Sequence, residues 1–277
     1  MRIRFLATAA LAVAVGLAGA ACSSSPQEAP LAKKAPVVKV GLLLDMQHER
    51  WERDRDLISE VVTDMGAELV VAWADGDQVR QNEQAQKMLA DGVAALLVVA
   101  HDTSNAAPLV DAARAKNVPV ISYDRLIRNA DVDLYIGFDV EKVGRLQAQH
   151  MLARAPRGNY VLIGGSENDG NSHLLRKGQM EVLEPEVKSG AIRIVHQGWA
   201  ENWSAASAAA ITEEALKKSR NNLAAIVASN DVTAGGAIEA LAKQGLAGKG
   251  GGSGQDAELA AAQRIVGGAA NEEGYKV

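Results

Sequence analysis

Cysteine and aromatic residues are scarce in this chain of 277 residues, which has one cysteine and an aromatic content of 4%. A single cysteine cannot form an intrachain disulfide, so the fold depends on the hydrophobic residues, which make up 48% of the sequence. The five histidines are scattered and lack the spacing of metal ligands, and we expect no cofactor. A net charge of -5 without a basic block argues against a nucleic-acid partner.

The N-terminus has no apolar run long enough for a comfortable transmembrane helix. Its apolar stretch covers residues 5–17, directly after Arg2 and Arg4. Small residues then continue to Ala21, as in the cleavage region of a secretion signal. We therefore expect residues 1–21 to be a signal peptide and the protein to be exported to the periplasm.

Cys22 follows this predicted signal directly and resembles the lipidated cysteine of bacterial lipoproteins. Gly19 departs from the aliphatic residue that usually stands three positions before that cysteine. An ordinary signal peptide with an incidental cysteine therefore remains an alternative. We favour lipid anchoring to a membrane, because residues 22–36 have the serine- and proline-containing composition of a tether.

Short apolar runs alternate with helical patterns from Val37 onward. Continuous apolar runs are typical of strands buried on both faces of a parallel sheet, and the repeated order implies right-handed crossovers in an α/β fold. The first helix should bury one face and should end at Gly66. The residues of that face are Leu57, Ile58, Val61, Val62 and Met65. Strands are expected over 37–44, 68–73, 93–99, 118–122, 134–136, 159–163, 191–197 and 223–228, with further helices over 79–90, 105–116, 140–154, 172–188, 204–217 and 232–244.

The alternating pattern restarts near residues 137–143, which predicts two similar lobes with a cleft between them. We place the N-terminal lobe at 37–138 and the C-terminal lobe at 139–277. A run of glycines over 248–254 stands where the second lobe needs another buried strand. Because glycine is poor in strand interiors, we expect no well-formed strand there and an incomplete C-terminal lobe.

Small polar clusters stand where the apolar runs end, and in open parallel sheets ligands bind at the carboxyl ends of the strands. Asp, Asn and Arg side chains suit sugar hydroxyls, and the flat face of Trp suits the C–H face of a sugar ring. Two tryptophans, one from each lobe, could enclose such a ring. The candidates are Arg50, Trp51, Asp124, Arg125, Asp169, Asn171, Trp203, Asn230 and Asp256.

Several of these residues have simpler interpretations. Asp124 and Arg125 could form a surface ion pair of little energetic value. Asp169 and Asn171 could cap the helix over 172–188, and Asn230 and Asp231 could cap the helix over 232–244. For the last two we expect a division of labour, in which one residue caps the helix and the other faces the cleft.

Six segments carry motifs that belong together: 48–56, 123–125, 164–171, 228–231, 234–238 and 253–256. Taken together, they resemble the D-xylose-binding periplasmic proteins of bacterial ABC transporters, over about 37–256 and more thinly to Lys276. The resemblance implies a type I periplasmic-binding-protein fold, with two Rossmann-like lobes joined by a three-stranded hinge. It also implies sugar contacts by the candidates above, by Lys276, and by Arg53, which stands where the family often has Lys. The family continues beyond this chain, which implies a shortened C-terminus.

We therefore expect the substrate-binding component of an ABC sugar importer, a monomer that binds D-xylose or a similar aldopentose and delivers it to a membrane permease. It should catalyse nothing. One alternative is a sugar sensor that presents its ligand to a chemoreceptor or histidine kinase. Another is a glycoside-processing enzyme that uses Asp45 and Asp124 as paired acids.

Overall fold

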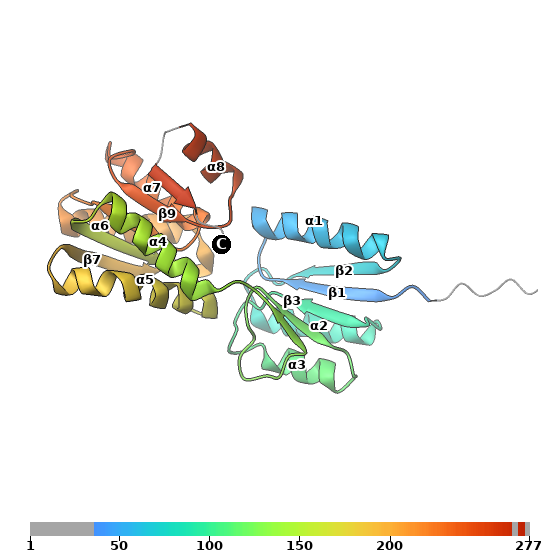
Figure 1. Cartoon of the computed structure of the whole chain (residues 1–277). Coiled ribbons are helices and arrows are strands. Elements are labelled where there is room, and N and C mark those ends of the chain that lie inside the picture. Colours follow the sequence, from blue (N-terminus) through green and yellow to red (C-terminus); the bar gives the residue numbers. More distant parts are fainter. Residues whose placement is uncertain (1–35, 268–270, 275–277) are drawn as a thin grey trace, which may run out of the picture. The chain divides into compact units, whose positions relative to one another are not determined.

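A computed structural model describes residues 36–267 and the backbone of 271–274, which belong essentially to one compact unit. Cys22 and Lys276 lie outside the described residues. The described chain forms two parallel sheets with helices on both faces, so the predicted α/β class is confirmed (Figure 1).

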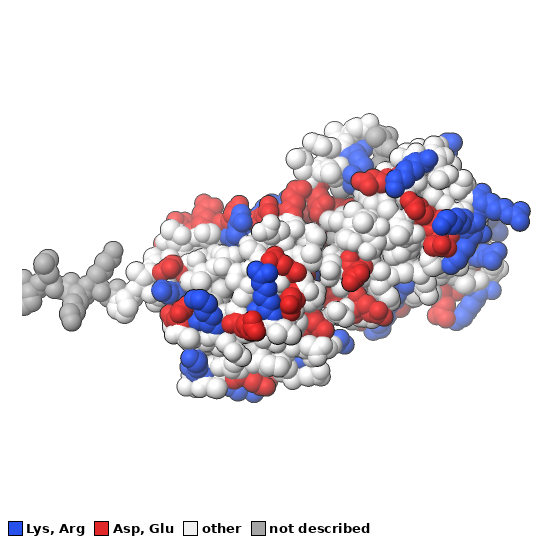
Figure 2. Space-filling model, turned by 180° about the vertical axis from the view of Figure 1, so that it is seen from behind, with Lys and Arg blue, Asp and Glu red and all other residues white. Residues whose placement is uncertain are grey.

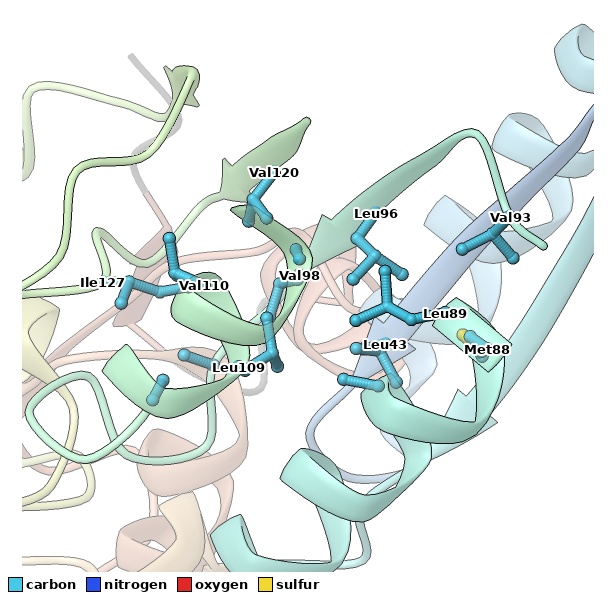
Figure 3. Close-up of a cluster of buried hydrophobic side chains, with 14 residues drawn as sticks. Leu43, Met88, Leu89, Val93, Leu96, Val98, Leu109, Val110, Val120 and Ile127 are labelled. Atoms are coloured by element: carbon cyan, nitrogen blue, oxygen red, sulfur yellow. The ribbon is translucent and has the colours of Figure 1, made fainter. Parts of the chain in front are cut away.

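The first sheet has the strand order β2-β1-β3-β4-β5. Its α1 side buries Leu42, Leu44 and Trp51, and its α2 and α3 side buries the larger cluster shown in Figure 3, which includes Leu43 and Leu109. Alternate residues of β1 therefore serve opposite faces, as expected for a buried strand. The elements are β1 (Lys39–Leu44), α1 (Glu49–Asp64), β2 (Glu68–Trp73), α2 (Gln78–Ala90), β3 (Ala95–Val98), α3 (Ala107–Arg114), β4 (Val120–Tyr123) and β5 (Leu134–Ile136).

The second sheet has the order β10-β9-β8-β6-β7. Val161 and Ile163 of β6 pack with residues of α6 and α7, whereas Tyr160 and Leu162 pack with residues of α4 and α5. The elements are α4 (Val140–Arg154), β6 (Gly158–Gly164), α5 (Gly170–Lys188), β7 (Ile192–Trp199), the 3-10 helix η1 (Glu201–Trp203), α6 (Ala205–Ser219), β8 (Ala225–Ala228), α7 (Asp231–Lys243), β9 (Gly251–Gly254), α8 (Leu259–Val266) and β10 (Asn271–Gly274).

The glycine run forms β9, so the expectation that no strand would form there is wrong. β9 pairs with β8 on one side and β10 on the other. The side chain of Gln147 donates to the carbonyls of Ser229 (3.1 Å) and Gly254 (3.2 Å), which ties the ends of β8 and β9 together. A Cβ at Gly254 would lie 2.2 Å from the carboxylate of Asp231, so the packing itself requires glycine at this position. Backbone pairing and crowding thus outweigh the poor strand propensity of glycine.

The predicted buried face of α1 is right for Ile58, which packs against the core, and wrong for three other residues. Leu57, Val61 and Met65 are 56%, 58% and 80% exposed, and Trp51 is the residue of α1 that is fully buried. Ile58, two turns after Trp51, is the other contact of α1 with the core on this side of the sheet. The buried stripe is therefore narrower than the apolar pattern suggests. The end of the helix is as expected, with Gly66 in the left-handed conformation at φ 76°.

The described residues contain one connection between the two sheets. Within residues 36–267 and 271–274, the chain passes from one sheet to the other once, between the end of β5 and the start of α4.

Figure 2 shows acidic and basic side chains next to one another over one face of the molecule. Such a mixed surface differs from the basic patch with which proteins bind nucleic-acid backbones.

Candidate functional site

The polar residues at the strand ends line one cavity. It contains about 630 Å³ of empty space when its opening to solvent is included. Residues from both sheets contribute, because β1, β4, β6, β8 and β9 all direct their carboxyl ends toward it. The predicted residues that line it are Arg50, Trp51, Asp124, Arg125, Asp169, Asn171, Trp203, Asn230 and Asp256.

Arg125 is the most enclosed cation of the site and is only 4% exposed. Its Nη1 lies 2.7 Å from Asp45 Oδ2, and its Nε lies 2.7 Å from Asp169 Oδ2. It also donates to the carbonyl of Ala100 at 3.0 Å. Burial opposes its charge, but Asp169 and Asp45 outweigh burial and raise the pKa of Arg125. The guanidinium is therefore a permanent cation held between one carboxylate from each half of the site.

Asp45 does not line the cavity but binds Arg125, a role that the sequence did not predict. Besides Arg125, its carboxylate contacts His101 Nδ1 at 2.7 Å. Burial opposes its ionisation, but Arg125 and His101 outweigh this effect and lower the pKa of Asp45 to about 2. An acid of this strength is unsuited to protonating a glycosidic oxygen near neutral pH, which argues against the paired-acid interpretation. Its position directly after the first strand was the available signal.

A pH titration should reveal this carboxylate. The pKa of Asp45 is depressed in the folded state, so its contribution to stability is present above about pH 4 and is lost as the pH falls to about 2. The difference amounts to about 2 kcal/mol. Urea unfolding from pH 5 to pH 2 should therefore show a loss for the wild type that exceeds the loss for Asp45→Asn by this amount. Parallel stability curves for the two proteins would contradict the assignment.

Arg50 links the two halves of the site. Its Nη2 lies 2.6 Å from Asp124 Oδ1, and its Nη1 lies 3.3 Å from Asp256 Oδ1. Asn171 Nδ2 in turn donates to the carbonyl (3.1 Å) and to Oδ2 (3.3 Å) of Asp124. Burial opposes the charge of Arg50, but Asp124 and Asp256 outweigh burial and raise its pKa. Hydrogen bonds therefore cross between the two halves of the site in both directions, from Arg50 to Asp256 and from Asn171 to Asp124.

The interpretation of Asp124 and Arg125 as a surface ion pair is wrong. They are 7% and 4% exposed, and each pairs with partners other than its neighbour in sequence. Asp124 also adopts the left-handed conformation, with φ 62°, which is uncommon for residues other than glycine. This backbone turns two adjacent side chains toward separate partners.

Helix capping and cavity lining occur in the same residues. Asp169 caps α5 by accepting from the amide of Asn171 at 2.9 Å, and it also pairs with Arg125. Asn230 caps α7 through a capping box with Thr233 and lines the cavity as well. The expected division of labour is therefore wrong. Asp231 does not line the cavity, and its carboxylate accepts from the amide of Glu258 at 2.9 Å.

The two tryptophans both line the cavity. Trp203 is 9% exposed and ends the 3-10 helix η1. Its Nε1 donates to Asp169 at 3.2 Å, and a Cβ at Gly165 would lie 2.3 Å from the indole. Trp51 has the guanidinium of Arg50 at 4.2 Å from its ring centroid. The ring orientations are thus fixed by charged neighbours and by close packing.

Arg53 is a predicted ligand that does not line the cavity. Arg53 is 42% exposed in its side chain and donates to the backbone carbonyl of Asp256 at 3.2 Å. Lys276 lies outside the described residues. Glu49 makes a further contact at this edge, where its carboxylate accepts from the amide of Leu259 at 3.1 Å. Within the described residues, no group of three or more His, Cys, Asp or Glu side chains is arranged to hold a metal ion.

The family model described as "Periplasmic binding protein domain" matches residues 40–273, and the chain belongs to this family. It is a family of binding proteins, so the protein is not an enzyme and the glycosidase alternative is wrong. In the part of the chain that the structure covers, no helix has the length and apolar character needed to cross a membrane.

Two curated relatives narrow the comparison. The chain is 46% identical over 240 residues to the D-xylose-binding periplasmic protein of Haemophilus influenzae, covering 86% of this chain and 72% of the relative. It is 43% identical over 247 residues to the protein of the same description from Escherichia coli, covering 89% and 75%. A solved carbohydrate transporter solute-binding protein from Chloroflexus aurantiacus, in complex with D-glucose, superposes with a TM-score of 0.78 at 28% identity, covering 86% of this chain and 78% of that one.

Proposed function

We propose that this protein is the substrate-binding component of an ABC sugar importer and that it binds D-xylose or a similar aldopentose in the cavity between the sheets. The observation that carries the proposal is a cavity lined from both sheets by Arg, Asp and Asn side chains and two tryptophans. The similarity to the two D-xylose-binding proteins supports the choice of sugar. In this proposal the lobes are 37–138 and the chain from 139 onward.

The charges of the site suit a polyol. Arg50 and Arg125 can only donate hydrogen bonds, whereas Asp124, Asp169 and Asp256 accept them, and a sugar hydroxyl does both. Each hydrogen bond to a charged group contributes about 1.5–3 kcal/mol. Trp51 and Trp203 offer apolar faces for the ring carbons.

Binding and lobe closure are coupled in this proposal. The pairs Arg125–Asp169 and Arg50–Asp256 join the two halves of the site, so they form only when the lobes are together. A sugar that contacts both halves binds the closed form better and shifts the population toward it. A membrane permease then recognises the closed form. In the sensor alternative, a receptor recognises the same form.

Isothermal titration with xylose, ribose, arabinose and glucose tests the proposal. We expect heat of binding with xylose and weaker binding of glucose. At a sugar concentration of 100 times Kd, the free energy of unfolding should rise by about 2.7 kcal/mol. The proposal fails if the folded protein binds none of the four sugars.

Lipid anchoring through Cys22 is part of the same proposal. Replacing Cys22 with serine removes the thiol that would carry the lipid, so the variant should move from the membrane fraction to the soluble periplasmic fraction. Mass spectrometry of the wild type should show an N-terminal mass increase from acyl chains. Recovery of both proteins in the soluble fraction, with no added mass, would instead favour the ordinary signal peptide.

A further inference from the structure

His48 stands at the start of α1, two residues before Arg50, and has an extended backbone with φ -133° and ψ 151°. Its carbonyl accepts the first helical hydrogen bond, from the amide of Glu52 at 3.0 Å. A residue in this position usually caps the helix with its side chain, but the side chain of His48 makes no capping bond. The imidazole is therefore not used to begin the helix.

His48 is instead one of the residues that line the ligand cavity, together with Arg50, Trp51 and Asp256. Its Nε2 is buried and has no hydrogen-bond partner among the described residues. A buried polar atom left unpaired costs about 1–3 kcal/mol, so such an atom in a binding cavity calls for an explanation. A ligand hydroxyl is the partner that the location suggests.

The electrostatic surroundings keep this histidine neutral. Burial lowers the pKa of His48, the charges of Asp45 and Asp256 partly oppose that effect, and Arg125 adds to it. A neutral imidazole has one nitrogen that donates and one that accepts. Carboxylates and guanidinium groups in the cavity have one of these roles only. His48 thus offers a chemically different contact.

We propose that His48 is a specificity-determining residue whose Nε2 hydrogen-bonds one hydroxyl of the bound sugar and so selects among sugars that differ at that carbon. This inference rests on the proposed sugar-binding function. Nε2 donates a hydrogen bond in one tautomer of the imidazole and accepts one in the other, and a sugar hydroxyl can match either role. A sugar that lacks this hydroxyl places a C–H group against Nε2, and the nitrogen then has no hydrogen-bond partner.

Three variants test the inference by isothermal titration with D-xylose at pH 7.5. His48→Leu removes both nitrogens and should weaken binding roughly 2–12-fold, the equivalent of one neutral hydrogen bond. His48→Gln keeps a donor and an acceptor and should recover part of the affinity. His196→Leu, at a histidine of β7 that does not line the cavity, is the matched control and should bind as the wild type does.

A set of monodeoxy-xyloses identifies the hydroxyl. For the sugar that lacks the contacted hydroxyl, the wild type and His48→Leu should bind equally well, and for the others the difference should persist. The thermal stability of the sugar-free protein separates this role from a structural one. His48→Leu removes an unpaired buried nitrogen, so its melting temperature should equal or exceed that of the wild type.

The outcomes separate the two hypotheses. If the wild type binds none of the sugars, the proposed function fails and the role of His48 fails with it. If the wild type binds xylose, and both His48 variants bind every sugar as tightly as the wild type, only the role of His48 is overturned. A lower melting temperature for both variants, with a uniform loss of affinity for all sugars, would also overturn it in favour of a structural role.

Discussion

Replacing Arg125 with methionine is expected to abolish sugar binding and to lower the free energy of unfolding by about 3–5 kcal/mol. The guanidinium is 4% exposed and holds Asp45 and Asp169 at 2.7 Å each. Methionine has a similar length but no charge. It would leave two buried carboxylates without their counter-ion, and this uncompensated charge accounts for most of the expected loss.

The loss of binding follows from the same contacts. Asp169 is 1% exposed, and burial raises its pKa, while Arg125 and the amide of Asn171 lower it in part. Without Arg125, the ionised form of Asp169 loses its nearest cation, and protonation of the carboxyl becomes more favourable. A protonated Asp169 also holds Trp203 Nε1 less strongly, because the hydrogen bond to it is no longer charge-assisted. One substitution therefore affects three side chains of the cavity.

Urea unfolding and isothermal titration measure the two effects. Arg145→Met is the matched control, because Arg145 also pairs with an acid, Glu181 at 3.0 Å, but its side chain is 34% exposed. Surface pairs contribute about 0–1 kcal/mol, so the control should unfold nearly as the wild type does and should bind xylose normally. Equal stability of the Arg125 and Arg145 variants would contradict the buried role of Arg125. Should Arg125→Met not fold, Arg125→Lys keeps the charge, and its weaker binding can still be measured.

The positions of the site residues were predictable to the extent that they follow strands. Asp124, Asp169 and Asn230 come directly after or soon after apolar runs, and the carboxyl ends of parallel strands meet at one edge of a sheet. That rule needs no knowledge of side-chain partners. It places residues from distant parts of the chain in one cavity, and the structure brings them together there.

The partners of these residues were not predictable, because pairing depends on distances across the fold. Asp45 and Arg125 are 80 positions apart, and no local pattern indicates that they meet. Asn230 has a double role for another reason. A helix that begins at the end of a strand places its capping residue at the cavity. His48 escaped notice because a histidine before a helix has no distinctive pattern.

The errors in the fold also have physical causes. The low strand propensity of glycine argued against β9. Its hydrogen bonds to β8 and β10 are made by the backbone, however, and do not depend on side chains. For α1, the apolar pattern indicated a wide buried stripe. The helix covers the edge of the sheet that includes β2, where Trp51 fills much of the space and Leu57 and Val61 are left exposed.

Replacing Arg50 with methionine should weaken xylose binding by at least 100-fold while leaving the fold intact. Arg50 bonds to Asp124 of the first half of the site at 2.6 Å and to Asp256 of the second half at 3.3 Å. The substitution removes the closure bond to Asp256 and, in the proposed function, a bond from the guanidinium to a sugar hydroxyl. Each charge-assisted bond contributes about 1.5–3 kcal/mol, and about 2.7 kcal/mol corresponds to 100-fold in Kd. The two carboxylates would also face each other without the cation, which opposes closure.

A double variant separates these two effects. In Arg50→Met the repulsion between Asp124 and Asp256 remains, whereas in Arg50→Met with Asp256→Asn one of the two charges is gone. If repulsion opposes closure, the double variant should close more readily on xylose than the single variant, and small-angle scattering should show a smaller radius of gyration at saturating sugar. Arg50→Lys is the matched control, because an ammonium keeps the charge but lacks the planar fork that reaches both carboxylates, so its affinity should lie between wild type and Arg50→Met. Identical affinities for Arg50→Lys and the wild type would show that charge alone, rather than the two-sided bridge, is what Arg50 contributes.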